Sequence, residues 1–576
     1  MTDEPPHDTD APARLGRIDT NLYAEDVALQ EAVAREGAGP SRRLINAYGL
    51  FCGSEYATDL AAAARRSPLR YESHDPLGNR IDRVIIDPAE TRLIEAAVAE
   101  GMAADIAGPH PSGPHPPGAA AAPGTAAAAG GETVSRAAAV FLSAQLGTGH
   151  LALPVASHAA LAALASAMHA SGQEAAVSEV LGEWQRRASA RRFDPSASPW
   201  SEKATLTLGL ALAEPPWLPA PGDAPVLAGE IGEPRGRVTV TAKRLAEVRC
   251  DADGLLLVAQ QPASPGSGPT LVLVPALRDD GRRNGRRLVR RVGLIGGLAR
   301  ATVETEIDAA EGIIVGREGE AAGPLLEARA RLGLDTATMA AGLLRQLVSL
   351  SRDYVAHTHR GGAFMAAAAE PLCADVAIAS EAATALVFRL ARSADLAGDV
   401  RARAWRRLMT PVTVLAVTAA ARQVAGELQA ASGGLGMVDQ LALRPIADDI
   451  AGLHLWTGAS PATAAEVLSV LQHAPEAVEI VLEDLLAAAG DDPHLRRAHA
   501  RIEAILHEPR YLDRRVGELA DALGQLAAAT ILRAHAPAAV ADAFIATRCA
   551  ALGRHTWGQG LYWADTPTIL ARAWGT

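Results

Sequence analysis

The sequence predicts a mainly α-helical protein with a β-domain in the middle of the chain. Three observations support this fold class. Ala, Leu and Val recur at helical spacing in the first part of the chain, and the same spacing returns near Leu325 and continues to the C-terminus. Between these parts, from Ala204, short β-prone runs alternate with Gly, Pro and Asp. The order is therefore helices, strands, helices and further helices.

Length and composition indicate a protein of several domains. A chain of 576 residues exceeds what one core usually supports. Hydrophobic residues make up 49% of the chain but aromatic residues only 4%, so the cores must be built from Ala, Leu and Val. The net charge of -12 argues against a protein whose main role is to bind the phosphate backbone of a nucleic acid.

We expect a cytoplasmic protein without membrane spans. No apolar segment follows the first residues, and no uninterrupted apolar run is long enough and uncharged enough to cross a bilayer. The cysteines lie far apart without C-x-x-C spacing, which predicts buried free thiols at Cys52, Cys250, Cys373 and Cys549.

The N-terminal helical domain is predicted to span residues 1–203. Residues 108–131 interrupt it with Pro, Gly and Ala at a density that sustains neither helix nor sheet, so we expect a flexible loop. Its two histidines, His110 and His115, suggest a metal site, but no carboxylate or thiol accompanies them. A solvated insertion is the favoured interpretation, and we predict no metal site.

The middle β-domain is predicted over residues 204–316. The β-prone runs suggest an antiparallel sheet with strands at 206–212, 238–241, 255–260, 271–274 and 301–307. The most basic segment of the chain lies between two of these strands and contains Arg282, Arg283, Arg286, Arg287, Arg290 and Arg291. On a hairpin it would attract phosphates, but a solvated loop is the favoured interpretation.

A helical bundle is predicted at 317–475 and an additional helical region at 476–576. Breaks in the helical pattern occur at Gly361–Gly362, Pro411 and Gly433–Gly434. In the bundle, His357 and His359 stand two apart, which directs them to different helix faces, so a shared metal is not expected.

Several motifs in consistent order resemble the acyl-CoA dehydrogenase family, in particular its AidB-like, alkylation-response branch. They are Asn21-Leu22-Tyr23, Ala32-Val33, Arg35–Gly39, Leu69-Arg70-Tyr71, Val134–Ala138, Phe388–Arg392, Thr410-Pro411, Gly433–Gly436, Trp456-Thr457-Gly458 and Val467–Leu471. The resemblance covers nearly the whole chain. It implies an α-helical domain, a β-barrel-like domain and an α-helical bundle, followed by the extra C-terminal helices of this branch.

The resemblance also implies an FAD site, and Thr457 decides its chemistry. In the family an aromatic-Glu-Gly step supplies the carboxylate that removes the proton next to the thioester, and here Thr457 stands in the place of that Glu. A threonine hydroxyl is not such a base. Trp456 and Gly458 occupy the flanking cofactor-contacting positions. The nearest acids in sequence, Asp448 and Asp449, are interpreted as a solvated helix face.

Other family elements at the flavin are partly kept. The glycine turn Gly433, Gly434 and Gly436 is intact, although a helix-ending turn needs the same residues. Arg360 keeps an arginine that reaches the FAD pyrophosphate of a neighbouring subunit in the family, but a solvated arginine at a helix end is equally compatible. The family has a hydroxyl-bearing Thr at one wall of the flavin site. Here Ala213, which follows Leu212, stands in the place of that Thr, and prolines come after Ala213.

We interpret the chain as an acyl-CoA dehydrogenase-like flavoprotein oxidoreductase homologue. It would bind FAD weakly, form a homodimer or homotetramer, and take an acyl-CoA-like or other small ligand without standard dehydrogenation. The alternatives are a catalytically silent scaffold of the same fold and a DNA-associated alkylation-stress protein. The composition of residues 476–576 argues against DNA binding by this region. It has 13 acidic residues, ten arginines and no lysine, so it carries no excess of positive charge. A cluster at Arg496, Arg497, Arg501, Arg510, Arg514 and Arg515 would form a basic face or intersubunit salt bridges.

Overall fold

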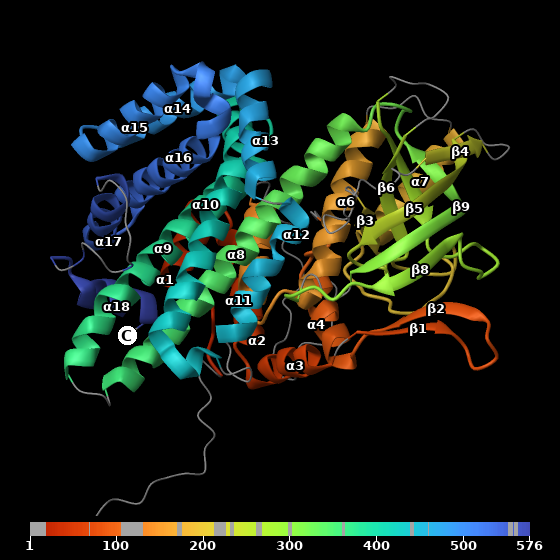
Figure 1. Ribbon diagram of the computed structural model, residues 1–576, viewed down its shortest axis with the longest axis horizontal. Coiled ribbons are helices and arrows are strands. Elements are labelled where there is room, and N and C mark those ends of the chain that lie inside the picture. Colours follow the sequence, from red (N-terminus) through yellow and green to blue (C-terminus); the bar gives the residue numbers. More distant parts are fainter. Residues whose placement is uncertain are drawn as a thin grey trace, which may run out of the picture.

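A large helical body and a smaller sheet domain lie side by side in the protein (Figure 1). The computed structural model describes residues 19–67, 69–104, 131–169, 175–211, 226–230, 236–260, 268–297, 302–359, 363–437, 443–458, 460–550, 557, 561 and 563–575. The predicted loop at 108–131, with His110 and His115, lies almost entirely outside these residues. The predicted class, mainly α with a middle β-domain, is confirmed.

Short, well-capped helices form the N-terminal region. They are α1 (Val27–Arg35), α2 (Arg42–Cys52), α3 (Glu55–Arg66), α4 (Pro88–Ala99), α5 (Glu132–Ala144), α6 (Ala152–His169) and α7 (Ala175–Ala188), with 3-10 turns at Gly39–Ser41 and Gly149–Leu151. Asp26 and Ser54 accept hydrogen bonds from Leu29 N and Ala57 N, which satisfies free N–H groups at the starts of α1 and α3.

A β-hairpin within this helical region was not predicted. Strands β1 (Arg70–His74) and β2 (Arg80–Ile85) pair antiparallel and lie against the sheet domain (Figure 1). The Tyr71 hydroxyl and Arg80 Nη2 both donate to the Leu288 carbonyl, at 2.8 and 2.7 Å. Arg283 Nε donates in return to Ile81 O at 2.9 Å. The hairpin therefore fastens the N-terminal region to the sheet.

One seven-stranded sheet builds the middle domain. Its strands are β3 (Leu208–Ala211), β4 (Val226–Glu230), β5 (Arg237–Glu247), β6 (Gly254–Ala259), β7 (Thr270–Pro275), β8 (Arg286–Arg291) and β9 (Val303–Val315). They run in the order β3-β6-β7-β9-β5-β4, with β8 also paired to β9. All pairs are antiparallel except β3 with β6, which is parallel and departs from the predicted all-antiparallel sheet.

The arginine-rich segment is partly a strand, so the prediction of a solvated loop was wrong for 286–291. Arg286 is buried and pairs with the buried Glu247 at 2.6 Å, while Arg290 pairs with Glu304 at 2.7 Å. Alternation along β8 places Arg286 and Leu288 inward and other arginines outward. Neighbouring strands thus supply the carboxylates that the local sequence does not show.

Long helices form the bundle, and further helices cover one side of it. The bundle contains α8 (Ala322–His359), α9 (Ala363–Asp395), α10 (Val400–Ser432), the 3-10 turn η3 (Gly433–Met437), α11 (Leu443–Gly452), α12 (His454–Thr457) and α13 (Ser460–His473). The C-terminal region contains α14 (Pro475–Ala489), α15 (Pro493–Leu506), a 3-10 turn at Pro509–Tyr511, α16 (Leu512–His535), α17 (Ala538–Phe544), a π-helical turn at Ile545–Cys549 and α18 (Thr566–Trp574).

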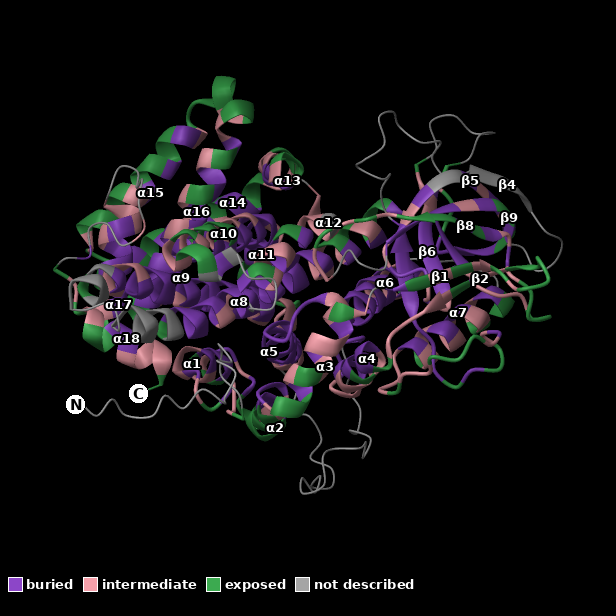
Figure 2. Cartoon of the chain, turned by 60° about the horizontal axis from the view of Figure 1, so that its bottom comes forward, coloured by how far each residue is buried: buried purple, intermediate pink, exposed green. Residues whose placement is uncertain are grey.

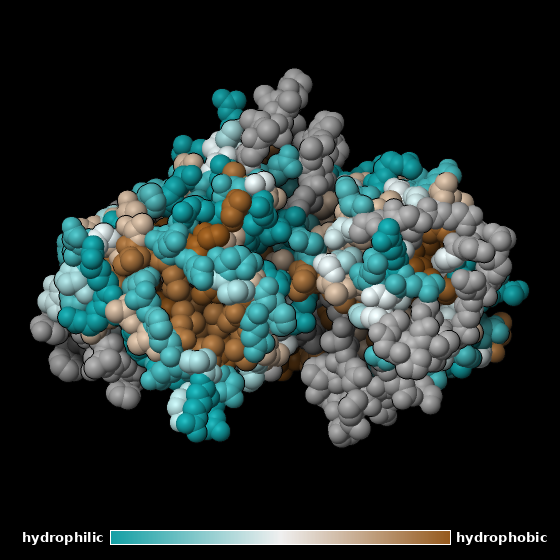
Figure 3. Space-filling view, turned by 90° about the horizontal axis from the view of Figure 1, so that it is seen from above, coloured by the Kyte–Doolittle hydropathy of each residue, from teal (hydrophilic) through white to brown (hydrophobic). Residues whose placement is uncertain are grey.

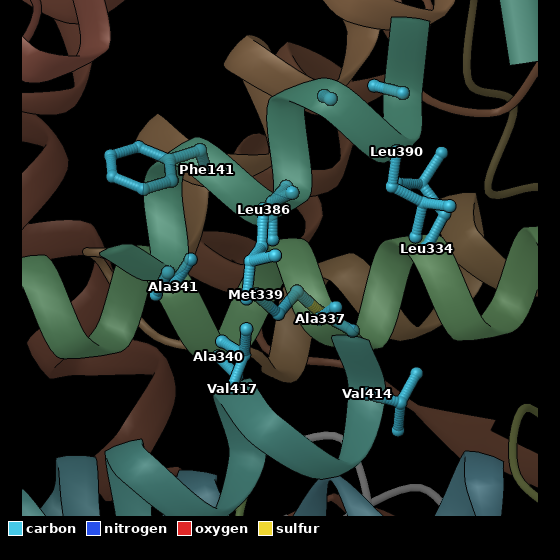
Figure 4. Packing of buried hydrophobic residues seen from close by; sticks show 14 of the residues in the cluster. Phe141, Leu334, Ala337, Met339, Ala340, Ala341, Leu386, Leu390, Val414 and Val417 are labelled. Atoms are coloured by element: carbon cyan, nitrogen blue, oxygen red, sulfur yellow. The ribbon is translucent and has the colours of Figure 1, made fainter. Parts of the chain in front are cut away.

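Small residues let the central helices approach closely. Figure 4 shows Phe141 of α5, Met339 of α8, Leu386 of α9 and Val417 of α10 converging on one core, and the bundle interior is buried in Figure 2. A Cβ at Gly342 would lie 2.4 Å from the Phe141 carbonyl oxygen, so α5 and α8 meet backbone to backbone there. A core with few aromatic residues is filled in this way.

Three helices are long and apolar enough to cross a membrane by length and composition, contrary to the expectation from sequence. They span 149–169, 369–395 and 400–432, and 78%, 83% and 67% of their most apolar windows are buried in the protein. Their apolar surface is therefore largely covered by neighbouring helices.

All four thiols are free, as the sequence predicts. Cys52, Cys250 and Cys373 are buried, and Cys549 is half-buried. Burial raises the pKa of Cys373 and of Cys549 to about 12, so these thiols stay protonated and unreactive.

A buried ionic network ties the N-terminal region to the bundle. Arg136 of α5 makes a bidentate pair with Asp335 of α8, including a contact of 2.9 Å from Nη2 to Oδ2, and His158 Nδ1 of α6 lies 3.2 Å from the same Oδ2. Arg136 Nη2 also donates to Met102 O at 2.6 Å. Burial would raise the pKa of Asp335, but Arg136 and His158 hold it below its ordinary value.

The last helix is held by one arginine between two distant carboxylates. Arg572 of α18 pairs with Glu381 of α9 at 2.9 Å and with Glu31 of α1. Burial raises the pKa of Glu381, and the charge of Arg572 opposes this shift. The first and last described helices thereby share one ionic contact with the bundle.

We predict that Asp335→Asn destabilises the protein by about 3 to 5 kcal/mol, because the substitution leaves the Arg136 charge buried without its counterion. Urea unfolding followed by circular dichroism measures the change. The control is Asp513→Asn at an exposed position of α16, which should cost under about 0.5 kcal/mol. Equal losses in both variants would contradict the assignment of this network as a main tie.

Candidate functional site

The segment Trp456-Thr457-Gly458 forms the C-terminal end of the short helix α12 and the turn that leads to α13. Gly458 N donates to His454 O at 2.9 Å, and Gly458 has φ +78°, a conformation that suits glycine. The Thr463 hydroxyl donates to the Thr457 carbonyl oxygen at 3.3 Å. The turn packs on α8 and α13, so its side chains have fixed positions between two helices.

Two neighbouring donors of this turn lack partners. Trp456 Nε1 and Thr457 Oγ1 are both buried, and neither has a hydrogen-bond partner among the described residues. A buried donor without a hydrogen bond costs about 1 to 3 kcal/mol of folding stability. Two such donors on consecutive residues suit a ligand that brings hydrogen-bond acceptors to this turn.

Sequence reasoning missed a histidine beside the turn. His454 Nε2 lies 3.1 Å from Arg422 Nη1, so the imidazole accepts from the guanidinium. Burial and the charge of Arg422 lower the pKa of His454, which is therefore neutral at neutral pH. Because Arg422 occupies Nε2, this nitrogen is not available as a proton acceptor for another group.

The three glycines of the turn after α10, Gly433, Gly434 and Gly436, have different environments. Gly433 has φ +54° and ends α10, so the helix end explains it. A Cβ at Gly436 would lie 2.7 Å from Gln429 O, so packing explains that glycine. At Gly434 a Cβ would meet no described atom within 4 Å, and its φ is not positive. The described fold gives no reason for glycine at 434, whereas close approach by an outside group would.

The predicted flavin residues are not all brought together in the described chain. The glycine turn η3 packs on α10 and α11, whereas the Trp456–Gly458 turn packs on α8 and α13. Leu212, Ala213 and Arg360 lie outside the described residues. The described part of one chain therefore does not assemble the complete set.

Asp449 lies at the junction of three regions and is not part of a solvated face, so that interpretation was wrong. Its carboxylate accepts from Thr148 N at 3.0 Å and from Gly297 N at 2.6 Å. Thr148 connects α5 to α6, Gly297 follows β8, and Asp449 itself is buried on α11. Backbones cross closely here, since a Cβ at Gly297 would lie 2.5 Å from Gly149 N.

A cavity of about 490 Å³, the junction cavity, opens beside Asp449. Its lining comes from α3, α4, the α5–α6 connection, the segment after β8, and α11. The lining residues are Ala61, Ala62, Ala64, Arg65, Arg66, Glu90, Leu93, Leu146, Gly147, Thr148, Gly149, His150, Gly296, Gly297, Arg444, Pro445, Asp448 and Asp449. None of the residues predicted to contact flavin lines it.

His150 is the buried histidine of this cavity. Its Nε2 lies 2.7 Å from Ser143 Oγ, which in turn accepts from the Tyr48 hydroxyl at 3.0 Å. Burial, followed by the charges of Arg65 and Arg249, lowers the pKa of His150 to about 3. The imidazole is neutral at physiological pH and presents a polar but uncharged wall.

The C-terminal arginines pair largely within the chain. Arg501 and Arg515 contact Glu518 at 2.8 and 3.0 Å, and Arg496 contacts Asp491 at 3.0 Å. The alternative of intersubunit salt bridges is unnecessary for these three. The charges of these three arginines are locally compensated.

Solved structures with a similar fold include an ACDH-11 complex and a butyryl-CoA dehydrogenase. Caenorhabditis elegans ACDH-11 in complex with C11-CoA matches with a TM-score of 0.76 and 18% identity, covering 99% of this chain and 97% of that one. Butyryl-CoA dehydrogenase from Megasphaera elsdenii matches with a TM-score of 0.52 and 13% identity, covering 78% and 98%. The chain has the acyl-CoA dehydrogenase fold.

Sequence comparison places the chain more narrowly. Residues 15–195 match the family model of the adaptive response protein AidB N-terminal domain. AidB of Escherichia coli (strain K12), a proposed acyl-CoA dehydrogenase, is 26% identical over 498 residues, which is 85% of each chain. The chain is similar to AidB over most of its length, and the resemblance predicted from its motifs is confirmed.

We predict a pH dependence of stability that originates at His150. The pKa of this imidazole is about 3 in the folded protein and 6.5 as the reference value, so the unfolded chain binds more protons between these values. The free energy of unfolding must therefore fall as pH decreases through this window. His150→Gln should remove up to about 1.4 kcal/mol per pH unit of that slope.

Urea unfolding at a series of pH values measures this slope. The matched control is His494→Gln at an exposed position of α15. An unchanged slope in His150→Gln, relative to wild type and control, would refute the buried neutral assignment.

Proposed function

We propose that this AidB homologue binds FAD weakly and does not carry out standard acyl-CoA dehydrogenation. The observation that carries the proposal is the pair of buried donors without partners, Trp456 Nε1 and Thr457 Oγ1, at the turn that the family resemblance assigns to the flavin. Gly434, whose glycine identity the described fold does not require, is the second supporting observation.

The residues present fit a flavin in part. Trp456 and Thr457 would donate hydrogen bonds to acceptor atoms, and the glycine turn would admit the adenosine and pyrophosphate end against its backbone. When bound, FAD supplies a hydride acceptor. Ala213 and the following prolines remove donors that the family resemblance implies, and losing two or three neutral hydrogen bonds would weaken binding by about one to three decades.

The turn lacks a proton acceptor suited to dehydrogenation. The Thr457 hydroxyl orients a ligand but does not take up an α-proton near neutral pH. His454 is neutral, but its Nε2 accepts from Arg422 and is occupied. The chain is therefore proposed to hold an acyl-CoA-like ligand, the class of ligand present in the ACDH-11 structure, without oxidising it efficiently.

Self-association would complete the site. The η3 glycines and the Trp456–Gly458 turn have different neighbours in one chain, yet the resemblance assigns both to FAD across a subunit boundary. Figure 3 shows apolar side chains gathered in a hollow on the helical half of one face, with hydrophilic side chains around it. An apolar surface of this kind supports a homo-oligomer.

We predict that purified protein is nearly colourless and that added FAD raises its melting temperature modestly. Gly434→Leu should abolish the shift without lowering the melting temperature of the apoprotein, because a side chain there meets no described atom. The matched control is Gly426→Leu, an exposed glycine of α10 with equally open surroundings, which should keep the shift. Differential scanning fluorimetry and light scattering on the same samples report FAD binding and oligomer mass.

Absence of any shift at saturating FAD would favour a cofactor-free scaffold. A stoichiometric yellow protein would contradict the proposed weak site. A shift that survives in Gly434→Leu would remove the glycine turn from the cofactor site.

We predict that wild type turns over a panel of acyl-CoA thioesters at no more than background rate with an artificial electron acceptor. Thr457→Glu should not create robust turnover, because the changes at Ala213 and the prolines remain. Steady-state dye reduction in the presence of excess FAD measures both proteins. Strong wild-type turnover would reveal a base elsewhere and overturn the proposed loss of dehydrogenation.

A further inference from the structure

The junction cavity is a built space at the meeting of three regions. Small residues of α3 line one side of it, and the closely crossing backbones at Gly147, Gly149, Gly296 and Gly297 line another. Its volume of about 490 Å³ lies within the usual range for small-molecule sites, about 300 to 1,000 Å³. Leu93 and Leu146 give it an apolar wall.

The acidic groups of the cavity are largely engaged. Glu90 accepts from the buried Arg249 at 3.1 Å, and Asp449 accepts the two backbone N–H groups of the junction. Asp448 contacts Arg444 at 3.3 Å in a half-exposed pair, which is weak in water. The carboxylates therefore do little to repel an incoming anion.

Guanidinium groups approach the cavity from two sides. Arg66 is exposed at the end of α3, and Arg444 lies on the first turn of α11. A guanidinium carries five N–H donors, so Arg444 can contact Asp448 and a second anion together. Arg65 Nη2 supports the wall by donating to Leu146 O at 2.6 Å.

We propose that the junction cavity binds a small organic carboxylate, with its head at Arg66 and Arg444 and its apolar body against Leu93 and Leu146. A guanidinium group matches a carboxylate by charge-assisted hydrogen bonds, and Arg66 and Arg444 both line the cavity. The neutral His150 adds a polar contact without a further charge. This site is separate from the Trp456–Gly458 turn and does not depend on FAD binding.

Octanoate is the probe, and isothermal titration calorimetry measures its binding. Octanol has the alkyl chain without a charge, and acetate has the carboxylate without the alkyl chain. Octyl phosphate has the alkyl chain with a phosphate in place of the carboxylate. Octanoate should bind more tightly than each of these three. The double variant Arg66→Gln with Arg444→Gln should weaken octanoate binding by about tenfold or more, and Arg497→Gln at an exposed position of α15 should leave it unchanged.

Ala62→Leu reduces the cavity without touching either arginine and should also weaken octanoate binding. FAD binding, measured on the same variants, should stay unchanged, so failure here is distinguishable from failure of the flavin proposal. No octanoate binding by folded wild type, or equal binding by the double variant, would overturn the site. Tighter binding of octyl phosphate or octanol would overturn the carboxylate assignment.

Discussion

The arrangement of the three regions depends on one carboxylate in contact with two backbones. Asp449 accepts the N–H groups of Thr148 and Gly297, which lie on the connection between α5 and α6 and on the segment after β8. A buried carboxylate needs such donors, and N–H groups buried where backbones cross need such an acceptor. Because α11 continues into the turn at Trp456, the position of that turn relative to the sheet follows from the same contact. The cavity beside Asp449 is the space that remains where these three regions meet.

Local periodicity explains which elements could be predicted and which could not. The short apolar run at 255–260 lies between Gly254 and Pro262, which is typical of a buried strand, and β6 occupies 254–259. The arginine-rich β8 carries no such pattern, because its inward arginine is neutralised by Glu247 of β5, on the other side of β9 and 39 positions away in sequence. The β1–β2 hairpin has exposed, charged strands whose bonding partners lie on β8. Both elements depend on contacts that are distant in sequence.

The site shows the same division between local motif and distant partner. The turn at Trp456 was located by motif resemblance, and its orphaned donors are visible only once the surrounding helices are in place. Asp448 and Asp449 look alike as neighbours on a helix, but only Asp449 faces the two backbones. His150 and the junction cavity gave no sequence signal, because a lone histidine and scattered glycines are common in turns. The environment of His150 and the shape of the junction cavity are set by packing between elements that are distant in sequence.

The contact of Arg572 with Glu31 and Glu381 has a consequence for biosynthesis. Residues 31 and 572 are 541 positions apart, and translation produces the two carboxylates long before their shared cation. Until α18 emerges, Glu381 and Glu31 lie together with like charge, and burial of Glu381 is unfavourable without its counterion. The ionic contact that joins α1, α9 and α18 therefore forms only after α18 has been synthesised.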